Sequence, residues 1–435
     1  MGLSLYLVVA CFLVSLALPS GECKISRRES PILGDNVDFV SRKYDPTKYD
    51  SLMSDEDMER RNKVKEMMKQ AWDNYTRNGW GKVDDPTRDG HSFYLTTINL
   101  GTTIISAMDT LYIMDMTKEF DEAREWISKN FTLDGVNTPI SVSEATVQLI
   151  GGLLSCFALT GDTMFRDKAQ HVADKLLPAF SVSNGLPHSY IIPSTGSVAN
   201  NDWTKNRSFI AEVGSFYPEF AYLSDLTDNP IYINKVNQIR NTLKEEYKPD
   251  SPFSILIDPI TGKMERCNVT SNGGLFALTS ATLETRSHKY IDLAKILTDT
   301  CREIYNKIDI RFQEIEDEVS ESTEKPYILS SETIGSYLIL WRVTKDQKYR
   351  EWGWEELQAI EKNCPKDESY AFVRNVCSLN LSHIDIQRGY FLSETLKYLY
   401  LLFSDDKLIS QKYWFFNAEG HPLPVKERRY YRKRT

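Results

Sequence analysis

The chain has 435 residues, which is enough for one large domain or two ordinary ones. Hydrophobic residues make up 41% of it and charged residues 26%, so it can build a sizeable core. A net charge of −9 argues against a nucleic-acid partner, because phosphate binding is driven by positive charge. The tail 426–435 is basic but short, and we interpret it as a solvated chain end.

The N-terminus carries an apolar run from Leu3 to Leu18. The run is shorter than the roughly 20 residues of a membrane-spanning helix and suits the core of a signal peptide. Ser15 and Ala17 fit a cleavage site, although no Lys or Arg precedes the run. We therefore assign residues 1–20 to a signal peptide or a retained signal anchor. Either predicts targeting to the secretory pathway (endoplasmic reticulum or Golgi lumen, with secretion left open), and only the anchor predicts membrane contact.

Secretory targeting changes what asparagines and cysteines can do. Asn-X-Ser/Thr tripeptides occur five times and each could carry an N-glycan, although such tripeptides also arise by chance; their asparagines are Asn74, Asn130, Asn206, Asn268 and Asn380. Six cysteines follow Cys11, and their spacing does not fix disulfide connectivity. Cys156 lies in an apolar helical run, where we expect a buried free thiol, and no paired spacing indicates zinc.

Helical periodicity begins after a polar stretch, 21–55, that we interpret as a stem or N-terminal arm. Val64, Met68, Trp72 and Tyr75 share one helical face, and Gly79 is expected to end that helix. Further helices are predicted at 104–116 and 120–127.

Short polar turns between apolar helices recur along the chain, at 116–120, 159–165, 226–232, 285–290, 343–349 and 403–408. Their leading hydroxyl residues are separated by 43, 67, 58, 59 and 60 residues, which predicts an all-α protein of stacked helical hairpins. The connections are long and irregular, which favours a closed ring over an open solenoid, since loops on one face can build a site. We interpret the acidic connection 314–324 as a solvated loop.

The chain ends in an aromatic-rich stretch, 389–404, followed by the loop Asn417-Ala-Glu-Gly-His-Pro422. Apolar residues recur along 391–403 at helical spacing. The pattern predicts a core helix that delivers Asn417, Glu419 and His421 to one place.

This C-terminal block, Glu394-Thr-Leu-Lys-Tyr-Leu-Tyr-Leu-Leu-Phe-Ser-Asp-Asp406 with the loop, resembles glycoside hydrolase family 47, the class I α-1,2-mannosidases. Other stretches that resemble the family are 71–73, 80–81, 106–111, 120–124, 151–155, 211–213 and 349–354. The resemblance covers roughly 60–425. It implies an (α/α) barrel of six or seven helical hairpins, with a catalytic domain at 56–425.

Family 47 enzymes invert the configuration at the anomeric carbon, so the resemblance implies one carboxylic acid and one carboxylate base. Glu144 aligns with the acid and Glu332 with the base. Each has a structural alternative. Glu144 suits a helix start, where the helix dipole favours negative charge, and Glu332 suits the solvent-facing first turn of a helix.

The resemblance also implies sugar contacts from Glu212 and Glu419, while Glu219 matches a pocket or framework position. The family holds Ca²⁺ at the base of its pocket, with oxygen ligands that suit that ion. Here the calcium threonine is Ala418, which offers only its backbone carbonyl, and a nearby glutamate is Arg388. We therefore expect weak calcium binding or none.

Other departures concern the substrate site. Gln148 stands where the family has an arginine. Ser330-Ser331 replaces the Arg-Pro that precedes the family's base, and Gly335 replaces an acidic residue that follows it. A segment with another catalytic-site aspartate is missing, because only 233–263 occupies its interval; Asp250 and Asp258 do not match it. The resemblance implies a Cys267–Cys301 disulfide.

Three hypotheses remain open. The first is an α-1,2-mannosidase that trims high-mannose N-glycans in the secretory pathway. The second is a catalytically impaired relative that binds mannose-rich glycans or glycoproteins, as in quality control. The third is a truncated or alternatively spliced product that folds poorly because a hairpin is missing.

Overall fold

The computed structural model describes residues 49–81, 99–246, 256–264, 291–292, 294–303, 331–366, 369–373, 382–384 and 389–425. The chain divides into two compact units. Unit 1 comprises 1–46 and 132–273, and unit 2 comprises 47–131 and 274–435. Each unit is described by itself. The predicted N-terminal segment 1–20 and basic tail 426–435 lie outside the described residues, and the boundaries of the catalytic domain stay a prediction.

Unit 2 is built of helices and a few two-residue or three-residue strands. Its helices are η2 (Asp50–Leu52), α3 (Asp55–Asn78), α4 (Thr102–Ile113), α5 (Thr117–Asn130), α14 (Glu332–Thr344), α15 (Lys348–Asn363), the π-helix η7 (Phe391–Thr395) and α16 (Leu396–Leu402). Its strands are β6 (Pro365–Lys366), β7 (Ser369–Tyr370), β8 (Phe372–Val373), β9 (His383–Ile384), β10 (Trp414–Phe416) and β11 (Pro422–Pro424). They form three antiparallel pairs, β6–β7, β8–β9 and β10–β11.

Unit 1 is also built of helices and a few short strands. Its helices are α6 (Val142–Glu144), the π-helix η4 (Ala145–Ile150), α7 (Gly151–Thr160), α8 (Thr163–Leu176), η5 (Leu177–Phe180), η6 (Asp202–Thr204), α9 (Ile210–Gly214), α10 (Tyr217–Thr227) and α11 (Ile231–Glu246). Strands β1 (Ile140–Ser141), β2 (Tyr190–Ile192) and β3 (Ser197–Ala199) form an antiparallel sheet, and β4 (Ser208–Phe209) pairs with β5 (Leu256–Ile257).

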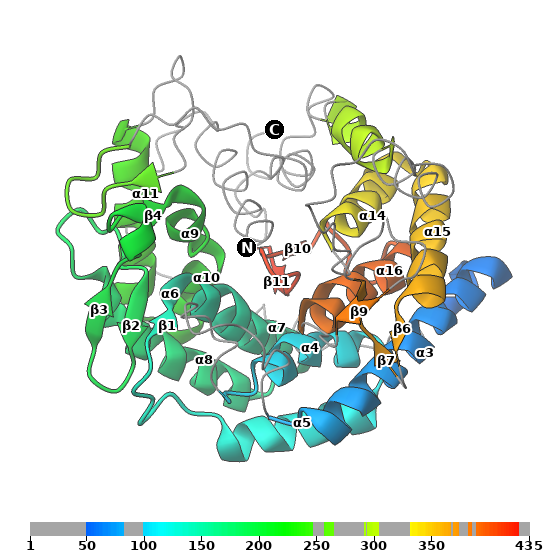
Figure 1. The fold of residues 1–435 in the computed structure, drawn as a ribbon, viewed down its shortest axis with the longest axis horizontal. Coiled ribbons are helices and arrows are strands. Elements are labelled where there is room, and N and C mark those ends of the chain that lie inside the picture. The colour runs from blue at the N-terminus through cyan, green and yellow to red at the C-terminus, as the bar shows by residue number, and fades with distance from the viewer. Residues whose placement is uncertain are drawn as a thin grey trace, which may run out of the picture. The chain divides into compact units, whose positions relative to one another are not determined.

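The predicted hairpins are confirmed at four of the six predicted turns. The turn at 403–408 follows α16 but leads to β10 and not to a second helix, so the hairpin predicted there is wrong. The turns at 116–120, 159–165, 226–232 and 343–349 join α4 to α5, α7 to α8, α10 to α11 and α14 to α15, and the two helices of each pair pack together (Figure 1). Left-handed residues end three of these first helices, Gly161 after α7, Asp228 after α10 and Lys345 after α14. The turn predicted at 285–290 lies outside the described residues.

Helix α3 confirms its predicted face and its predicted end. The side chains of Val64, Met68, Trp72 and Tyr75 are buried, and the Gly79 N–H donates to the Tyr75 carbonyl. The helix begins at Asp55, earlier than the apolar pattern indicates, because the Ser54 hydroxyl caps it by accepting from the Asp57 N–H. Polar residues in the first turns are therefore helical without contributing to the core.

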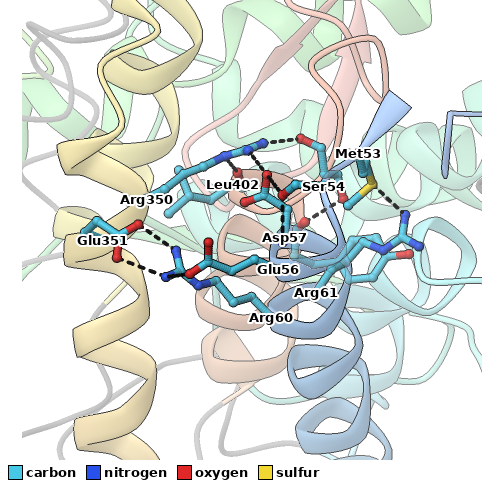
Figure 2. Close-up of polar contacts among 11 residues, drawn as sticks. Met53, Ser54, Glu56, Asp57, Arg60, Arg61, Arg350, Glu351 and Leu402 are labelled. Carbon is cyan, nitrogen blue, oxygen red and sulfur yellow. Dashed lines mark hydrogen bonds and ion pairs between the residues drawn. The ribbon is translucent and has the colours of Figure 1, made fainter. Parts of the chain in front are cut away.

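An arginine network fastens α16 within unit 2, and Figure 2 shows it. The buried Arg350 side chain, on α15, donates to the carbonyls of Leu402 and Ser404, each at 2.8 Å, and pairs with Asp57 on α3. These carbonyls end α16 and have no partner within the helix, so the guanidinium caps it. Beside it, Arg60 bridges Glu56 and Glu351, and Arg61 pairs with Asp50.

One stretch among the described residues, Val142–Thr160, is long and apolar enough to cross a membrane, with a mean hydropathy of 1.5. It is 83% buried inside the protein, as expected of a core helix. Cys156 lies within it as a buried cysteine that forms no disulfide, as the sequence predicts.

Candidate active site

Unit 2 gathers three glutamates, and Glu394 on η7 is the most deeply placed. The Ser331 hydroxyl donates to Glu394 Oε2 at 2.9 Å, and the glutamate is only 5% exposed. Burial raises the pKa of Glu394 well above its usual range, and the carboxylates of Glu419 and Glu332 raise it further. The surroundings of Glu394 therefore favour its protonated form over its ionised form.

Glu332 is the first residue of α14 and is half-buried. Its position in the first turn of a helix agrees with the structural alternative given for this glutamate. Its charge nevertheless acts on the buried carboxyl of Glu394. This combination of partial exposure and proximity to buried carboxyls is what a base that activates water would need.

The loop 417–421 brings Glu419 to the same group. The Asn417 Oδ1 atom accepts from the N–H groups of Glu419 and His421 at 3.0 and 2.9 Å, which closes the loop on itself. Glu419 is 9% exposed, and its charge also raises the pKa of Glu394. The structure thus confirms that the aromatic helix and the loop meet, as the sequence predicts.

A buried ionic cluster lies beside this loop. The Lys397 ammonium, on α16, is 2.7 Å from Asp109 Oδ1, and Nδ1 of His421 is 2.7 Å from Asp109 Oδ2. All three side chains are fully buried. Burial lowers the pKa of His421, so the ring is neutral and its Nδ1–H donates to the Asp109 carboxylate. Asp109 keeps its charge, because Lys397 and His421 lower its pKa although burial opposes them.

In unit 1, Glu144 ends the short helix α6. Its backbone N–H donates to the Ser141 hydroxyl at 3.2 Å, so Ser141 caps the helix that carries it. The π-helix η4 starts at the next residue. Inserted π-turns occur frequently at functional sites, because the extra residue re-aims neighbouring side chains. Glu144 is half-buried, so it fits both its structural interpretation and the implied acid.

Glu212, on α9, is joined to the start of α6 through Ser189. The Ser189 carbonyl accepts from the Val142 N–H at 2.9 Å, and the Ser189 hydroxyl hydrogen-bonds to the Glu212 carboxyl. Burial raises the pKa of Glu212 to about 7, and hydrogen bonds from Phe209 and Ser189 only partly offset it. Ser189 therefore ties Glu212 to the turn that carries Glu144.

The predicted site residues accordingly fall into two sets, Glu144 and Glu212 in unit 1 and Glu332, Ala418 and Glu419 in unit 2. Sequence reasoning missed Glu394, Lys397 and Asp109 as site residues. Glu394 and Lys397 are charged residues in an otherwise apolar run, and that signal was available. Other predicted positions, Cys267 and Arg388, lie outside the described residues, and Cys301 is a free, half-exposed thiol.

The loop 417–421 lacks one of the oxygen ligands that the family resemblance implies for Ca²⁺. Ala418 has no side-chain oxygen, so only its backbone carbonyl is available as a ligand at that position. Calcium affinity depends on the number and charge of oxygen ligands.

Comparison with known proteins identifies the family. The model of Glycosyl hydrolase family 47 matches residues 67–273 and 268–425. The chain belongs to this family. It is 38% identical to mannosyl-oligosaccharide alpha-1,2-mannosidase IA of Drosophila melanogaster, over 86% of this chain and 69% of the relative, and 33% identical to the IB enzyme of Mus musculus, over 85% and 71%.

The family fold is confirmed by a solved structure. An alpha-1,2-mannosidase from Trichoderma reesei matches with a TM-score of 0.69 and 18% identity, covering 84% of this chain and 99% of that one. This likeness confirms the predicted all-α, (α/α)-barrel class for the family 47 chain.

The alignments also support the missing segment. The Drosophila match spans 458 positions but uses 86% of the 435 residues here, or about 374, which leaves about 84 positions without a residue in this chain. The two stretches matched by the family model meet at 268–273, next to the interval 233–263 in which the sequence predicts the loss. This family 47 member therefore lacks residues that its relatives have.

The raised pKa of Glu212 predicts a pH-dependent stability. The folded state keeps a proton that the unfolded chain releases above pH 4.5, so this contribution to stability is lost as pH rises towards 7. Glu212→Gln removes the ionisation. We expect its stability advantage over the unmodified chain to be small at pH 5 and to grow to about 3 kcal/mol at pH 8.

Urea unfolding between pH 5 and 8 measures this difference. Glu245→Gln, at an exposed glutamate on α11 of the same unit, is the matched control and should change stability equally at every pH. A Glu212→Gln advantage that does not grow with pH would contradict the assigned pKa.

Proposed function

We propose that this chain is an inverting α-1,2-mannosidase that trims high-mannose N-glycans of glycoproteins in the secretory pathway. One observation carries the proposal: a family 47 chain with relatives named mannosyl-oligosaccharide α-1,2-mannosidases retains the acid and base candidates, Glu144 and Glu332. The pKa shifts in both units add support, because displaced carboxyl pKa values are typical of acid–base sites.

Each carboxyl then has a role. Glu144 protonates the oxygen that leaves, and Glu332 accepts a proton from the attacking water on the opposite face of the sugar. Glu212 and Glu419 bind sugar hydroxyls. Glu394 has a raised pKa, and in its protonated form it donates a hydrogen bond where an ionised carboxylate can only accept one. A hydroxyl-rich sugar can use both kinds of partner.

Incubation of the purified chain with a nine-mannose N-glycan tests the activity by mass spectrometry. We expect mannose loss with inversion at the anomeric carbon, and a fall in kcat of at least about 100-fold in Glu332→Gln and in Glu144→Gln, because each removes one proton transfer. Glu245→Gln, at an exposed glutamate of α11, should retain the rate of the unmodified chain.

A folded sample that binds the glycan without releasing mannose would favour the second candidate, a catalytically impaired glycan-binding protein. Ala418, Gln148 and the missing residues favour that outcome. A sample that neither binds nor cleaves and is aggregated would favour the poorly folded product.

We propose that calcium binds weakly, because Ala418 lacks the hydroxyl ligand of the family. Restoring it should strengthen binding, so we expect Ala418→Thr to lower the Kd for Ca²⁺ by about tenfold or more, as one added oxygen ligand would. Calorimetric titration of both proteins measures this, with Ala418→Ser as the intermediate case. Tight calcium binding by the unmodified chain would contradict the proposal.

Secretory targeting leads to a specific glycan site. Asn130 ends α5 and is exposed, as is its acceptor-motif partner Thr132. Asn74 is half-buried inside α3, and the Ser208 of the Asn206 motif is buried. Asn268 and Asn380 lie outside the described residues. We therefore propose a glycan at Asn130. Cys301 carries a free thiol in the structure, and we propose that it forms a disulfide with Cys267 on oxidation in the same compartment.

Translation of the full chain with microsomes tests targeting and glycosylation separately. We expect protection from added protease and a mass shift that an N-glycosidase reverses, reduced by one glycan in Asn130→Gln. The conservative control is Thr132→Ser, which keeps the motif. Chains that the protease digests would contradict the targeting. Protected chains in which Asn130→Gln loses no glycan would contradict the glycosylation site. Peptide mapping without reductant tests the disulfide.

A further inference from the structure

The Lys397–Asp109 pair has an unusual degree of burial for two charged side chains. Both are fully buried, with 2.7 Å between the ammonium and Asp109 Oδ1. Such a pair is weak evidence for stability, because desolvation of both charges offsets their attraction, and two apolar side chains often serve as well. The pair therefore calls for an explanation other than stability alone.

A second contact of Lys397 supplies this explanation. Its ammonium also donates to the carbonyl of Gly420 at 2.7 Å, in the middle of the loop 417–421. The same loop is fixed a second time by His421, whose ring bonds to the other oxygen of Asp109. One aspartate on α4 thus anchors the loop at two points, directly through His421 and indirectly through Lys397.

The loop lies directly on the carboxyl group of η7. A Cβ built on Gly420 would meet Tyr398 Oη at 2.8 Å and Glu394 Cγ at 3.0 Å, and the φ of Gly420 is +71°. Only glycine suits both the close approach and the left-handed backbone. Any displacement of the Gly420 carbonyl would therefore change the space around Glu394, and with it the position of the neighbouring Glu419.

We infer that Lys397, held by Asp109, is a positioning residue that sets the loop 417–421, and so Glu419, against Glu394. The inference deepens the proposed glycosidase function and rests on it for its kinetic consequence. Lys397 and Asp109 need not touch the sugar in this role. They fix the separation of two carboxyl groups, which determines how a sugar is bound between them.

Neutralising both partners separates positioning from stability. The single variants Lys397→Met and Asp109→Asn each leave one buried group without its partner, and both should lower Tm. The double variant Asp109→Asn/Lys397→Met contains no buried charge from this pair, so its Tm should recover most of the loss. We expect its kcat to remain at least about tenfold below that of the unmodified chain.

Two further readouts report the loop itself. Hydrogen exchange of the Glu419 and His421 amides, which Asn417 protects, should be faster in the double variant than in the unmodified chain. Gly420→Ala should lower kcat while leaving Lys397 and Asp109 in place. The control is Tyr232→Phe, which removes the bond from the buried Tyr232 to the exposed Asp174 in unit 1 and should lower Tm without changing kcat or the loop's exchange.

The outcomes are distinct. If the double variant regains both Tm and kcat with unchanged exchange, the pair is only structural and the inference fails. If the unmodified chain is inactive, the proposed function fails, and exchange together with glycan affinity still tests the positioning. Faster exchange and weaker glycan binding in the double variant would then support it.

Discussion

A charge inside a protein is tolerated only when it is paired and hydrogen-bonded, and the placement of the loop 417–421 in unit 2 depends on how this constraint is met at Asp109. The carboxylate has two oxygens, and each has a partner, Lys397 or His421. Because Lys397 lies on α16 and His421 ends the loop, satisfying one buried charge brings a helix and a loop together. The position of Glu419 follows from that arrangement.

Glu394 meets the same constraint in the opposite way. Two carboxylates act on it, and its direct partner is the neutral hydroxyl of Ser331, so binding a proton is the easier way to remove the charge. Asp109, with a cation at 2.7 Å, stays ionised at a similar depth. The surroundings of these two acidic side chains therefore shift their pKa values in opposite directions within one unit.

The sequence predicts the helices and hairpins well because their determinants are local. The face of α3, its end at Gly79 and four of the polar turns follow from spacing and capping residues. The π-helices η4 and η7 could not be predicted, because an extra residue per turn is stabilised by packing against other elements. For the same reason the sequence showed Glu394 and Lys397 only as charges in an apolar run, while their partners Ser331 and Asp109 lie far away in the chain.

The departures from the family predict an impaired enzyme, whereas the buried Asp109–Lys397–His421 cluster is expected in an active one. We give more weight to the cluster. Ala418 removes one ligand atom that the family resemblance implies. The Lys397–Asp109 pair is fully desolvated, and an apolar pair in its place is often at least as stable. What the pair does fix is the Gly420 carbonyl, and with it the loop 417–421 beside Glu394, which is the positioning role inferred for Lys397.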